Sequence, residues 1–450
     1  MRLAFFLAVA LLSGAPGRCG TDEDAAAEQS ARFDQPGRLS LPFMVLPHRL
    51  GRPVDLPSLF ESRGRRVFRM PQARDEDFND LYLIAAPLSS EELSAYGQVL
   101  RHEPGNFLIM KVAPGSTAAL SRKLHESGCA CGALIRLYGD PMELRAAVPE
   151  PAPLVPVAQE LPEITAAAAK IDAAKIQDYV DQISAIHTRY HESRTGREAA
   201  AVLARIYESL KGQRQDVEIE LYAHEGRTPQ PSLIVRIIGR KHPNEIVVLG
   251  SHIDSINWRD GEEARAPGAD DDASGTAVNL EIFRVLMQEG LALDRTLEIH
   301  GYAAEEIGLV GSQHMASNYR SQGKAVVAQL QHDMTLYRSG EKDMIWLVTN
   351  NTNPSLTRDL GVLIERYAGV GSGRAPLYAG SSDHVSWHRK GYPVAFPSEN
   401  PKDFNPRIHT ANDTTRGASF TQAAAFARLG LAYAGHYAGA SRASRVIGRR

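Results

Sequence analysis

Cysteine is scarce in this sequence of 450 residues, which has only three: Cys19, Cys129 and Cys131. Because no cysteine follows Cys131, the long remainder of the chain cannot form a thiolate-rich structural zinc module. Any metal site there must use histidine and carboxylate ligands instead. Cys129 and Cys131 form a Cys-x-Cys pair, for which a strained local disulfide and two free thiols are both open interpretations.

A strong excess of charge of either sign is also missing. The net charge of −3 at pH 7 gives no electrostatic reason to expect nucleic acid or an anionic membrane as a partner. Long apolar runs are missing too, apart from residues 3–12, which follow Arg2 and precede small residues. This layout predicts a secretory signal peptide over residues 1–20, with a buried N-terminal helix as the alternative. Since no later stretch approaches about 18 apolar residues, we expect a soluble protein in the periplasm or outside the cell.

The length favours two domains with terminal extensions. Residues 21–38 are polar and expected to be disordered. Residues 39–140 are expected to form a small α/β domain without chemistry of its own. Its strand-like runs are 81–86, 107–112 and 133–138, and they alternate with helices that begin near Ser89, with a capping signature, and near Ser116. Residues 141–170, rich in Pro and Ala, predict a linker open to proteolysis, and residues 438–450 a solvated basic tail.

A second domain is predicted over residues 171–437, where strand-like runs alternate with helical patterns. Residues 246–250 form a continuous apolar run, which is typical of a strand covered on both faces. The expected strands are 217–221, 233–238, 246–250, 296–299, 326–330, 344–349 and 394–396, and the expected helices include 198–211, 273–289, 307–319, 354–367 and 420–437. The fold class is therefore α/β, with a mixed, mostly parallel sheet flanked by helices.

Polar side chains follow several of these strands. His252 follows the strand 246–250, Glu305 and Glu306 follow 296–299, and Asp333 follows 326–330. Ligand sites of open α/β sheets form at this carboxyl edge.

Each of these signals has a structural alternative when taken alone. A single histidine at a strand end is more often just hydrogen-bonded, and adjacent glutamates often begin a helix. The acidic run Asp270, Asp271 and Asp272 could be an N-cap cluster before the helix at residue 273. Two histidines, His252 and His409, with three carboxylates nevertheless make a ligand set suited to a pair of zinc ions.

Residues 171–437 resemble the secreted bacterial leucyl aminopeptidases with a co-catalytic two-zinc site, of the zinc exopeptidase superfamily. The matching segments occur in the family's order and are 250–255, 266–275, 302–309, 331–335, 382–387 and 405–410. The resemblance implies a zinc-exopeptidase-like fold and two Zn²⁺ per chain. It also implies a cis peptide bond after Asp271.

The resemblance assigns a role to each polar residue. Asp271 bridges both zinc ions, His252 and Asp333 complete one site, and Glu306 and His409 complete the other. Glu305 is the general base, and Asp254 is the carboxylate that orients the His252 ring. One metal anchors the free α-amino group of a peptide, while Glu305 takes a proton from the attacking water and passes it to the leaving amine.

The resemblance also implies an apolar substrate pocket and therefore a preference for N-terminal Leu or another large apolar residue. The pocket positions are Met334, Leu347, Phe396, Phe404 and Ile408. Family members carry a tyrosine that stabilises the reaction intermediate in a disulfide-closed loop. Here residues 376–381 have no cysteine, and Tyr378 lies one position early. Whether Tyr378 reaches the site stays open.

The expected partners are peptides or proteins with a free N-terminus, and the chain is expected to be a monomer. Residues 39–140 are interpreted as a propeptide of a zymogen. Three alternatives remain: a glutaminyl cyclase with one zinc, a carboxypeptidase, for which no convincing basic cluster is present, and a receptor-like module of the same fold without metals.

Overall fold

The structure is a computed structural model that describes residues 41–47, 58–62, 65–70, 73–78, 80–84, 88–103, 107–127, 134–137, 156–377 and 382–442. The predicted signal peptide, the predicted disordered segment, Cys129, Cys131 and Tyr378 lie outside the described residues. None of the helices in the described part combines the length and the apolar character needed to cross a bilayer.

The chain divides into two compact units, residues 1–73 and 74–450. The first contains an antiparallel sheet of β1 (Phe43–Pro47), β2 (Ser58–Ser62) and β3 (Arg65–Arg69) in the order β1-β3-β2. The sequence patterns did not predict these strands individually.

A four-stranded sheet begins the second unit, in the order β5-β6-β4-β7. Its elements are β4 (Leu81–Ile84), α2 (Ser90–Leu93), the 3₁₀ turn η4 (Ser94–Tyr96), β5 (Gly97–Glu103), β6 (Phe107–Val112), α3 (Thr117–Glu126) and β7 (Leu134–Arg136). Ser89 caps α2 in a capping box with Glu92, as its sequence predicts. The predicted βαβαβ order omits β5. The strand pairs β4–β6, β4–β7 and β5–β6 are all antiparallel.

Helix α4 (Pro162–Ala168) lies within the range predicted as a linker. It belongs to the main hydrophobic core, because Leu161 and Ile164 are both buried there. Gly435 lies so close to this helix that an added Cβ would be 2.5 Å from Ile164. The folded core therefore begins before residue 171.

The central sheet has six strands in the order β16-β13-β10-β12-β9-β8. They are β8 (Val217–His224), β9 (Thr228–Ile237), β10 (His242–His252), β12 (Arg295–Tyr302), β13 (Ala325–Gln331) and β16 (Val394–Ala395). Four neighbouring strands, from β16 to β12, pair in parallel. At one edge of the sheet, β9 pairs antiparallel with β12, and β8 pairs antiparallel with β9. This arrangement confirms the mixed, mostly parallel sheet predicted from the sequence.

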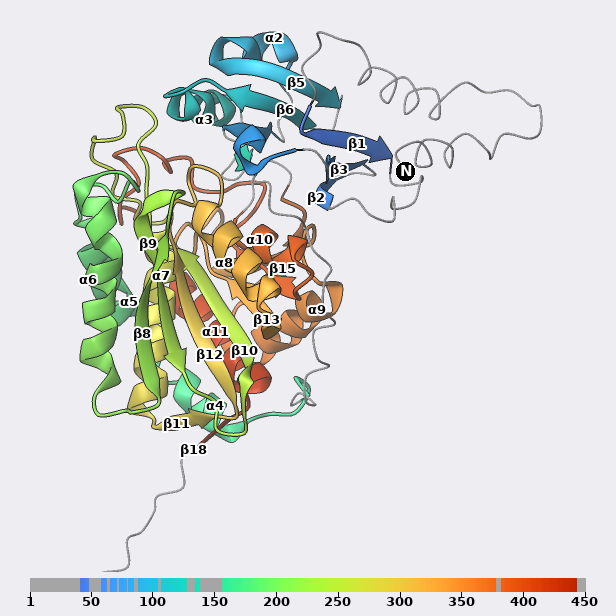
Figure 1. Ribbon diagram of the computed structural model, residues 1–450. Helices are drawn as coiled ribbons and strands as arrows, with labels where there is room; N and C mark the ends of the chain where they lie inside the picture. The colour runs from blue at the N-terminus through green and yellow to red at the C-terminus, as the bar shows by residue number, and fades with distance from the viewer. Residues whose placement is uncertain are drawn as a thin grey trace, which may run out of the picture. The chain divides into compact units, whose positions relative to one another are not determined.

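Helices cover both faces of this sheet (Figure 1). One face packs against α5 (Ala173–Ser184), α6 (Arg194–Lys211), α7 (Ala273–Gln288) and α11 (Phe420–Ala438), and the other against α8 (Val310–Ser321) and α10 (His384–Arg389). The alternation along β10 explains both contacts: Val247 and Leu249 enter the first core, and Ile246 and Val248 enter the second.

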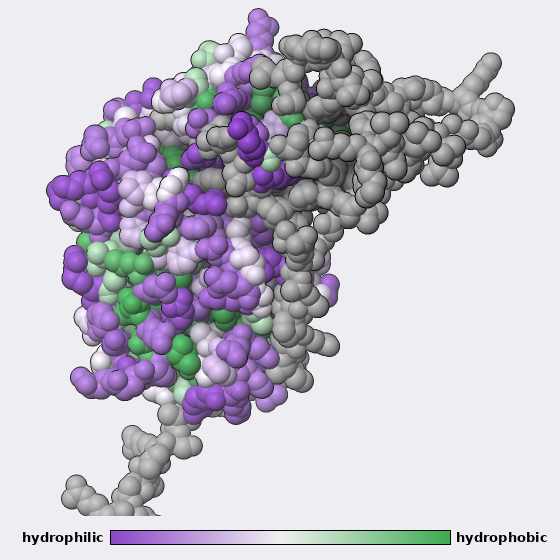
Figure 2. Space-filling model, in the orientation of Figure 1, coloured by the Kyte–Doolittle hydropathy of each residue, from purple (hydrophilic) through white to green (hydrophobic). Residues whose placement is uncertain are grey.

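Shorter elements complete the domain. They are α9 (Pro354–Leu363), the π turn η5 (Ile364–Ala368), a small sheet of β14 (Met344–Val348), β15 (Gly371–Ala375) and β17 (Pro397–Ser398), and the pair β11 (Leu291–Leu293) and β18 (Ala440–Arg442). The prediction of a solvated tail from residue 438 is wrong for residues 440–442, because they form β18, which pairs with β11, and Ala440 is buried. On the face shown in Figure 2, hydrophilic residues predominate. Leu221 of the edge strand β8, 45% exposed, is the exposed large hydrophobic residue of the described part.

Candidate metal centre

Three neighbouring strands bring the predicted donors to one edge of the sheet. His252 is the last residue of β10, which lies between β12 and β13. His252 pairs in register with Tyr302 of β12, and Glu305 and Glu306 follow that residue. Gly250 pairs with Gln331 of β13, two residues before Asp333. Parallel pairing therefore places these four side chains together.

Five side chains form two buried donor groups. His252, Asp271 and Asp333 make one group, and Asp271, Glu306 and His409 make the other; within each group the candidate ligand atoms lie within 4.8 Å of one another. Asp271 belongs to both: its Oδ1 lies 2.9 Å from Nε2 of His252, and its Oδ2 lies 3.0 Å from Nε2 of His409. Nε2 of His409 is also 2.9 Å from Oε2 of Glu306. One carboxylate thus faces two separate clusters of donors.

The chemistry of these donors fits a cation. Both oxygens of Glu305, Oε1 of Glu306 and Oδ1 of Asp333 are buried and have no hydrogen-bond partner among the described residues. Burial raises the pKa of Glu305 well above its usual range and that of Glu306 to about 7. Burying an uncompensated carboxylate costs free energy, and a bound cation would offset that cost. Nitrogen and oxygen donors of this kind fit divalent zinc.

The two histidines carry the opposite shift. Burial alone would lower the pKa of His409, but Glu306 and Asp271 outweigh burial and raise it to about 10. The pKa of His252 is likewise raised, by Asp333, Asp254 and Asp271 against the effect of burial. Conversely, hydrogen bonds from both histidines lower the pKa of Asp271 in spite of its burial. A histidine must be neutral to bind a metal, so protons compete with a metal ion at both rings.

The three consecutive aspartates have different partners. Asp270 accepts hydrogen bonds from the Leu336 N–H at 2.8 Å and from the Asn405 amide at 2.9 Å. Asp272 is the N-cap of α7, and its two oxygens accept from the N–H groups of Gly275 and His252. Only the middle carboxylate of the run belongs to the two donor groups. The N-cap interpretation is therefore confirmed for Asp272, whereas Asp271 is the member of the run that belongs to the donor groups, and the predicted cis bond joins Asp271 and Asp272.

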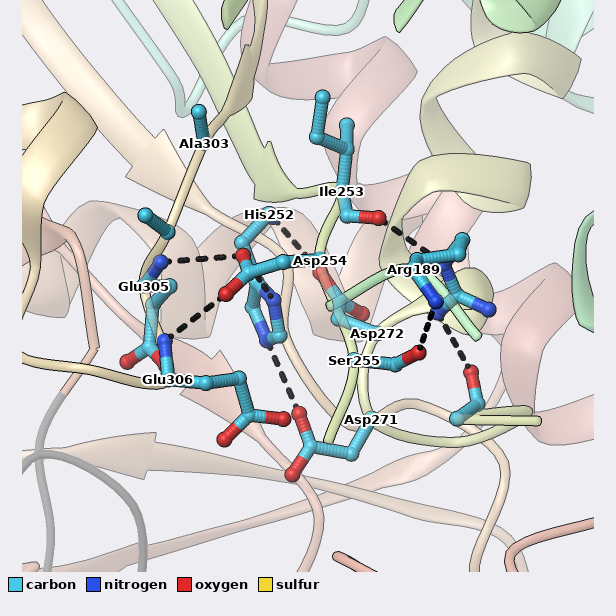
Figure 3. Close-up of polar contacts among 12 residues, drawn as sticks. Arg189, His252, Ile253, Asp254, Ser255, Asp271, Asp272, Ala303, Glu305 and Glu306 are labelled. Atoms are coloured by element: carbon cyan, nitrogen blue, oxygen red, sulfur yellow. Dashed lines mark hydrogen bonds and ion pairs between the residues drawn. The ribbon is translucent and has the colours of Figure 1, made fainter. Parts of the chain in front are cut away.

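Asp254 lies between His252 and the glutamate loop. Its Oδ1 is 3.4 Å from Nδ1 of His252. The same carboxylate accepts hydrogen bonds from the backbone N–H groups of Glu305 and Glu306, at 3.0 and 3.1 Å (Figure 3). Asp254 therefore fixes the backbone that carries both glutamates, a contact that the sequence did not suggest.

The predicted pocket residues do not all lie together. Met334, Ile408 and Phe404 form a small apolar cluster next to Asp333 and His409 in the sequence. The ring centroid of Phe396 lies 4.6 Å from that of His384, and the two rings are tilted by 34°. Leu347 lies in the main hydrophobic core with β14, so the structure does not group it with Met334. Tyr378 is outside the described residues.

Sequence reasoning missed two residues that hold the Asp271 loop. Asp413 accepts the N–H groups of Asp270 and Asp271, both at 3.1 Å. Arg189 is buried beside the same loop, where it donates to backbone carbonyl groups. Neither residue has a periodic or motif-like signal, because their partners are backbone atoms far away in the chain.

Comparisons with known proteins agree with this geometry. The model of peptidase family M28 matches residues 232–434. A leucine aminopeptidase 1 of Uncinocarpus reesii is 38% identical over 280 residues, which are 58% of this chain and 70% of that protein. A leucine aminopeptidase 1 of Arthroderma gypseum is 32% identical over 340 residues, 71% of this chain and 89% of that protein.

A solved structure extends the likeness to the fold. The crystal structure of the LapA aminopeptidase of Legionella pneumophila matches with a TM-score of 0.68 and 26% identity, and the match covers 80% of this chain and 98% of that chain. The sequence matches, the common fold and the two buried donor groups together show that this chain belongs to peptidase family M28, among its aminopeptidases.

Proposed function

We propose that this metallo-aminopeptidase removes the N-terminal residue of peptides, with two zinc ions as cofactors and Glu305 as the general base. The observation that supports this most directly is the position of Asp271 in both donor groups, beside a glutamate that belongs to neither. A carboxylate with one oxygen toward each donor group could bind both ions of a metal pair, and the ions of two-metal sites lie about 3.5–4 Å apart.

Each side chain of the centre has one proposed task. His252 and Asp333 would hold one metal, Glu306 and His409 the other, and Asp271 both. When bound, the metals supply Lewis acidity: they lower the pKa of a water and polarise the scissile carbonyl.

Glu305 would handle the protons of the reaction. Its two carboxylate oxygens have no hydrogen-bond partner among the described residues, so they are not committed to the fold. A buried carboxylate with a raised pKa can accept a proton from water and deliver it to the leaving amine. Asp254 would keep Glu305 in place through its backbone N–H.

The surroundings of the centre favour an amino end over a carboxyl end of the substrate. Glu305, Glu306 and Asp333 are all buried at the centre, and so is Asp383, whose pKa burial raises to about 8. None of these side chains is a cation that would bind a substrate carboxylate, whereas an α-amino group can donate hydrogen bonds to their carboxyl oxygens. This argues against the carboxypeptidase alternative.

An apolar N-terminal side chain fits the cluster of Met334, Phe404 and Ile408. Burying a leucine side chain contributes about 1.5–3 kcal/mol, which corresponds to roughly 10- to 100-fold in kcat/KM. We therefore propose a preference for Leu or another large apolar residue.

A panel of p-nitroanilides tests the proposed function. Leucine p-nitroanilide is expected to be cleaved roughly 10- to 100-fold more efficiently than the glycine substrate. Activity should be lost on chelation and restored by zinc, and N-acetyl-leucine p-nitroanilide, which has a blocked amine, should not be cleaved. Cleavage of the acetylated substrate at a similar rate would contradict recognition of the free amine. Cyclisation of an N-terminal glutamine with one zinc per chain would favour the glutaminyl cyclase alternative.

We also propose that the region before the catalytic core is a propeptide of a secreted, monomeric enzyme. The truncation that tests this must keep α4, because Leu161 and Ile164 are part of the core. A chain that begins at residue 156 is expected to be more active on leucine p-nitroanilide than the full-length chain. Equal specific activity of the two chains would contradict an inhibitory propeptide.

A further inference from the structure

A fully buried arginine joins the loops that carry His252 and Asp271. Arg189 lies between α5 and α6 and is 1% exposed. Its Nε donates to the carbonyl oxygen of Ile253 at 2.9 Å, directly after His252. Its two terminal nitrogens donate to the carbonyl oxygens of Pro267 at 2.6 Å and Gly268 at 3.0 Å, on the loop that leads to Asp271. One planar guanidinium therefore donates hydrogen bonds to both donor loops.

The backbone of Arg189 reinforces the same connection. Its N–H donates to Oγ of Ser255 at 3.1 Å, and that hydroxyl donates to the carbonyl oxygen of Ala266 at 2.8 Å. Figure 3 shows Arg189 against Ile253 and Ser255, on the side of His252 that faces away from Glu305.

A third donor loop is tied to Arg189 through one glutamine. The amide nitrogen of Gln230 donates to the Arg189 carbonyl oxygen at 3.1 Å. The amide oxygen of Gln230 accepts the N–H of Ala304 at 3.1 Å, and Ala304 directly precedes Glu305. All the loops that supply His252, Asp271 and Glu306 therefore converge on one residue.

We propose that Arg189 is a positioning residue of the metal centre, which sets zinc affinity by fixing the separation of the His252 and Asp271 loops. The inference rests on the proposed metal centre, since it concerns the same ligands. The guanidinium suits this task because its donors point in fixed directions within a plane, whereas lysine offers a single ammonium group on a flexible stem.

The charge of Arg189 acts in the same direction. Burial lowers the pKa of Arg189, but the negative charges of Asp254, Asp272, Asp413 and Asp271 oppose that effect, so the guanidinium remains a cation. It offsets part of the repulsion among these carboxylates, which would otherwise push the loops apart.

The test replaces arginine with lysine at two buried positions. R189K keeps the charge but not the fork, and R295K is its matched control. Arg295 is 3% exposed, begins β12 at the end opposite Glu305, and donates to Glu245 and to the carbonyl oxygen of Tyr437. Zinc affinity is measured on stripped protein by competition with a chromophoric chelator, and thermal unfolding is measured with and without zinc.

R189K is expected to bind zinc about 10- to 100-fold more weakly, as is usual for residues that orient metal ligands. Its zinc-induced rise in Tm should shrink, and excess zinc should restore part of its activity. R295K should lower the Tm of the stripped protein but keep wild-type zinc affinity. S255A removes only the hydroxyl that links the Arg189 N–H to the carbonyl oxygen of Ala266, so it should weaken zinc binding less than R189K.

Wild-type zinc affinity in folded R189K would overturn the proposal and leave Arg189 a residue of the fold only. If R189K does not fold, S255A decides: unchanged zinc affinity in S255A would then overturn it. Failure of the proposed function is a different result, because a wild-type chain that binds no zinc would give no affinity to compare.

Discussion

Replacing Glu305 with glutamine is expected to lower kcat by about 10²- to 10⁴-fold while the protein keeps its zinc. Glutamine has nearly the same shape as glutamate but cannot accept a proton at pH 7. Glu305 belongs to neither donor group, so its loss should leave both groups intact. The measurements are kcat on leucine p-nitroanilide at saturating zinc, and zinc content by elemental analysis.

Two further glutamate-to-glutamine variants make this result specific. E306Q removes a member of a donor group and should lose zinc as well as activity. E341Q changes an exposed glutamate and should behave like the wild type. If E305Q kept most of its kcat, the role of Glu305 as the base would be wrong. If E305Q lost zinc as E306Q does, Glu305 would be a ligand instead.

The second large effect is expected for Asp271. D271N should reduce zinc content from about two ions per chain to almost none, because the neutral amide has one carbonyl oxygen and cannot serve both donor groups. Activity should fall to background. D333N, which alters one group only, should lose one zinc ion and retain the other.

The adjacent aspartate provides the matched control. D270N alters hydrogen bonds to Leu336 and Asn405 but leaves both donor groups complete, so it should retain zinc while its stability falls. The D271N loop should stay folded, since Asp413 holds the backbone N–H of residue 271 whatever its side chain. Circular dichroism and thermal unfolding check this. A D271N protein that still bound two zinc ions would contradict the bridging role.

The strand-end residues show which parts of the site could be predicted. His252, Glu305, Glu306 and Asp333 stand next to apolar runs that form strands, and parallel strands bring their carboxyl ends to one edge. Their proximity therefore follows from local pattern and sheet direction. The same reasoning missed residues 97–103, which have no regular alternation of polar and apolar residues but form β5 and pair antiparallel with β6.

The loops show the limit of such prediction. The pattern of Asp270, Asp271 and Asp272 does not itself indicate which carboxylate faces the donors, and only the family resemblance singled out Asp271. The orientation of each side chain depends on a loop whose backbone N–H groups are held by Asp413, far away in the chain. Leu347 was assigned to the pocket by resemblance, yet it packs in the main core. A side chain's surroundings depend on elements that the local sequence does not contain.

By itself, the sequence determined the mixed α/β class of the catalytic domain, the cysteine-free ligand set and the edge at which that set gathers, because periodicity and residue chemistry are local properties. Only the tertiary structure decided that Asp254 holds the glutamate loop and that Arg189 joins the loops of the centre. These contacts join residues far apart in the chain through backbone atoms, which are the same in every residue and therefore leave no trace in the sequence pattern.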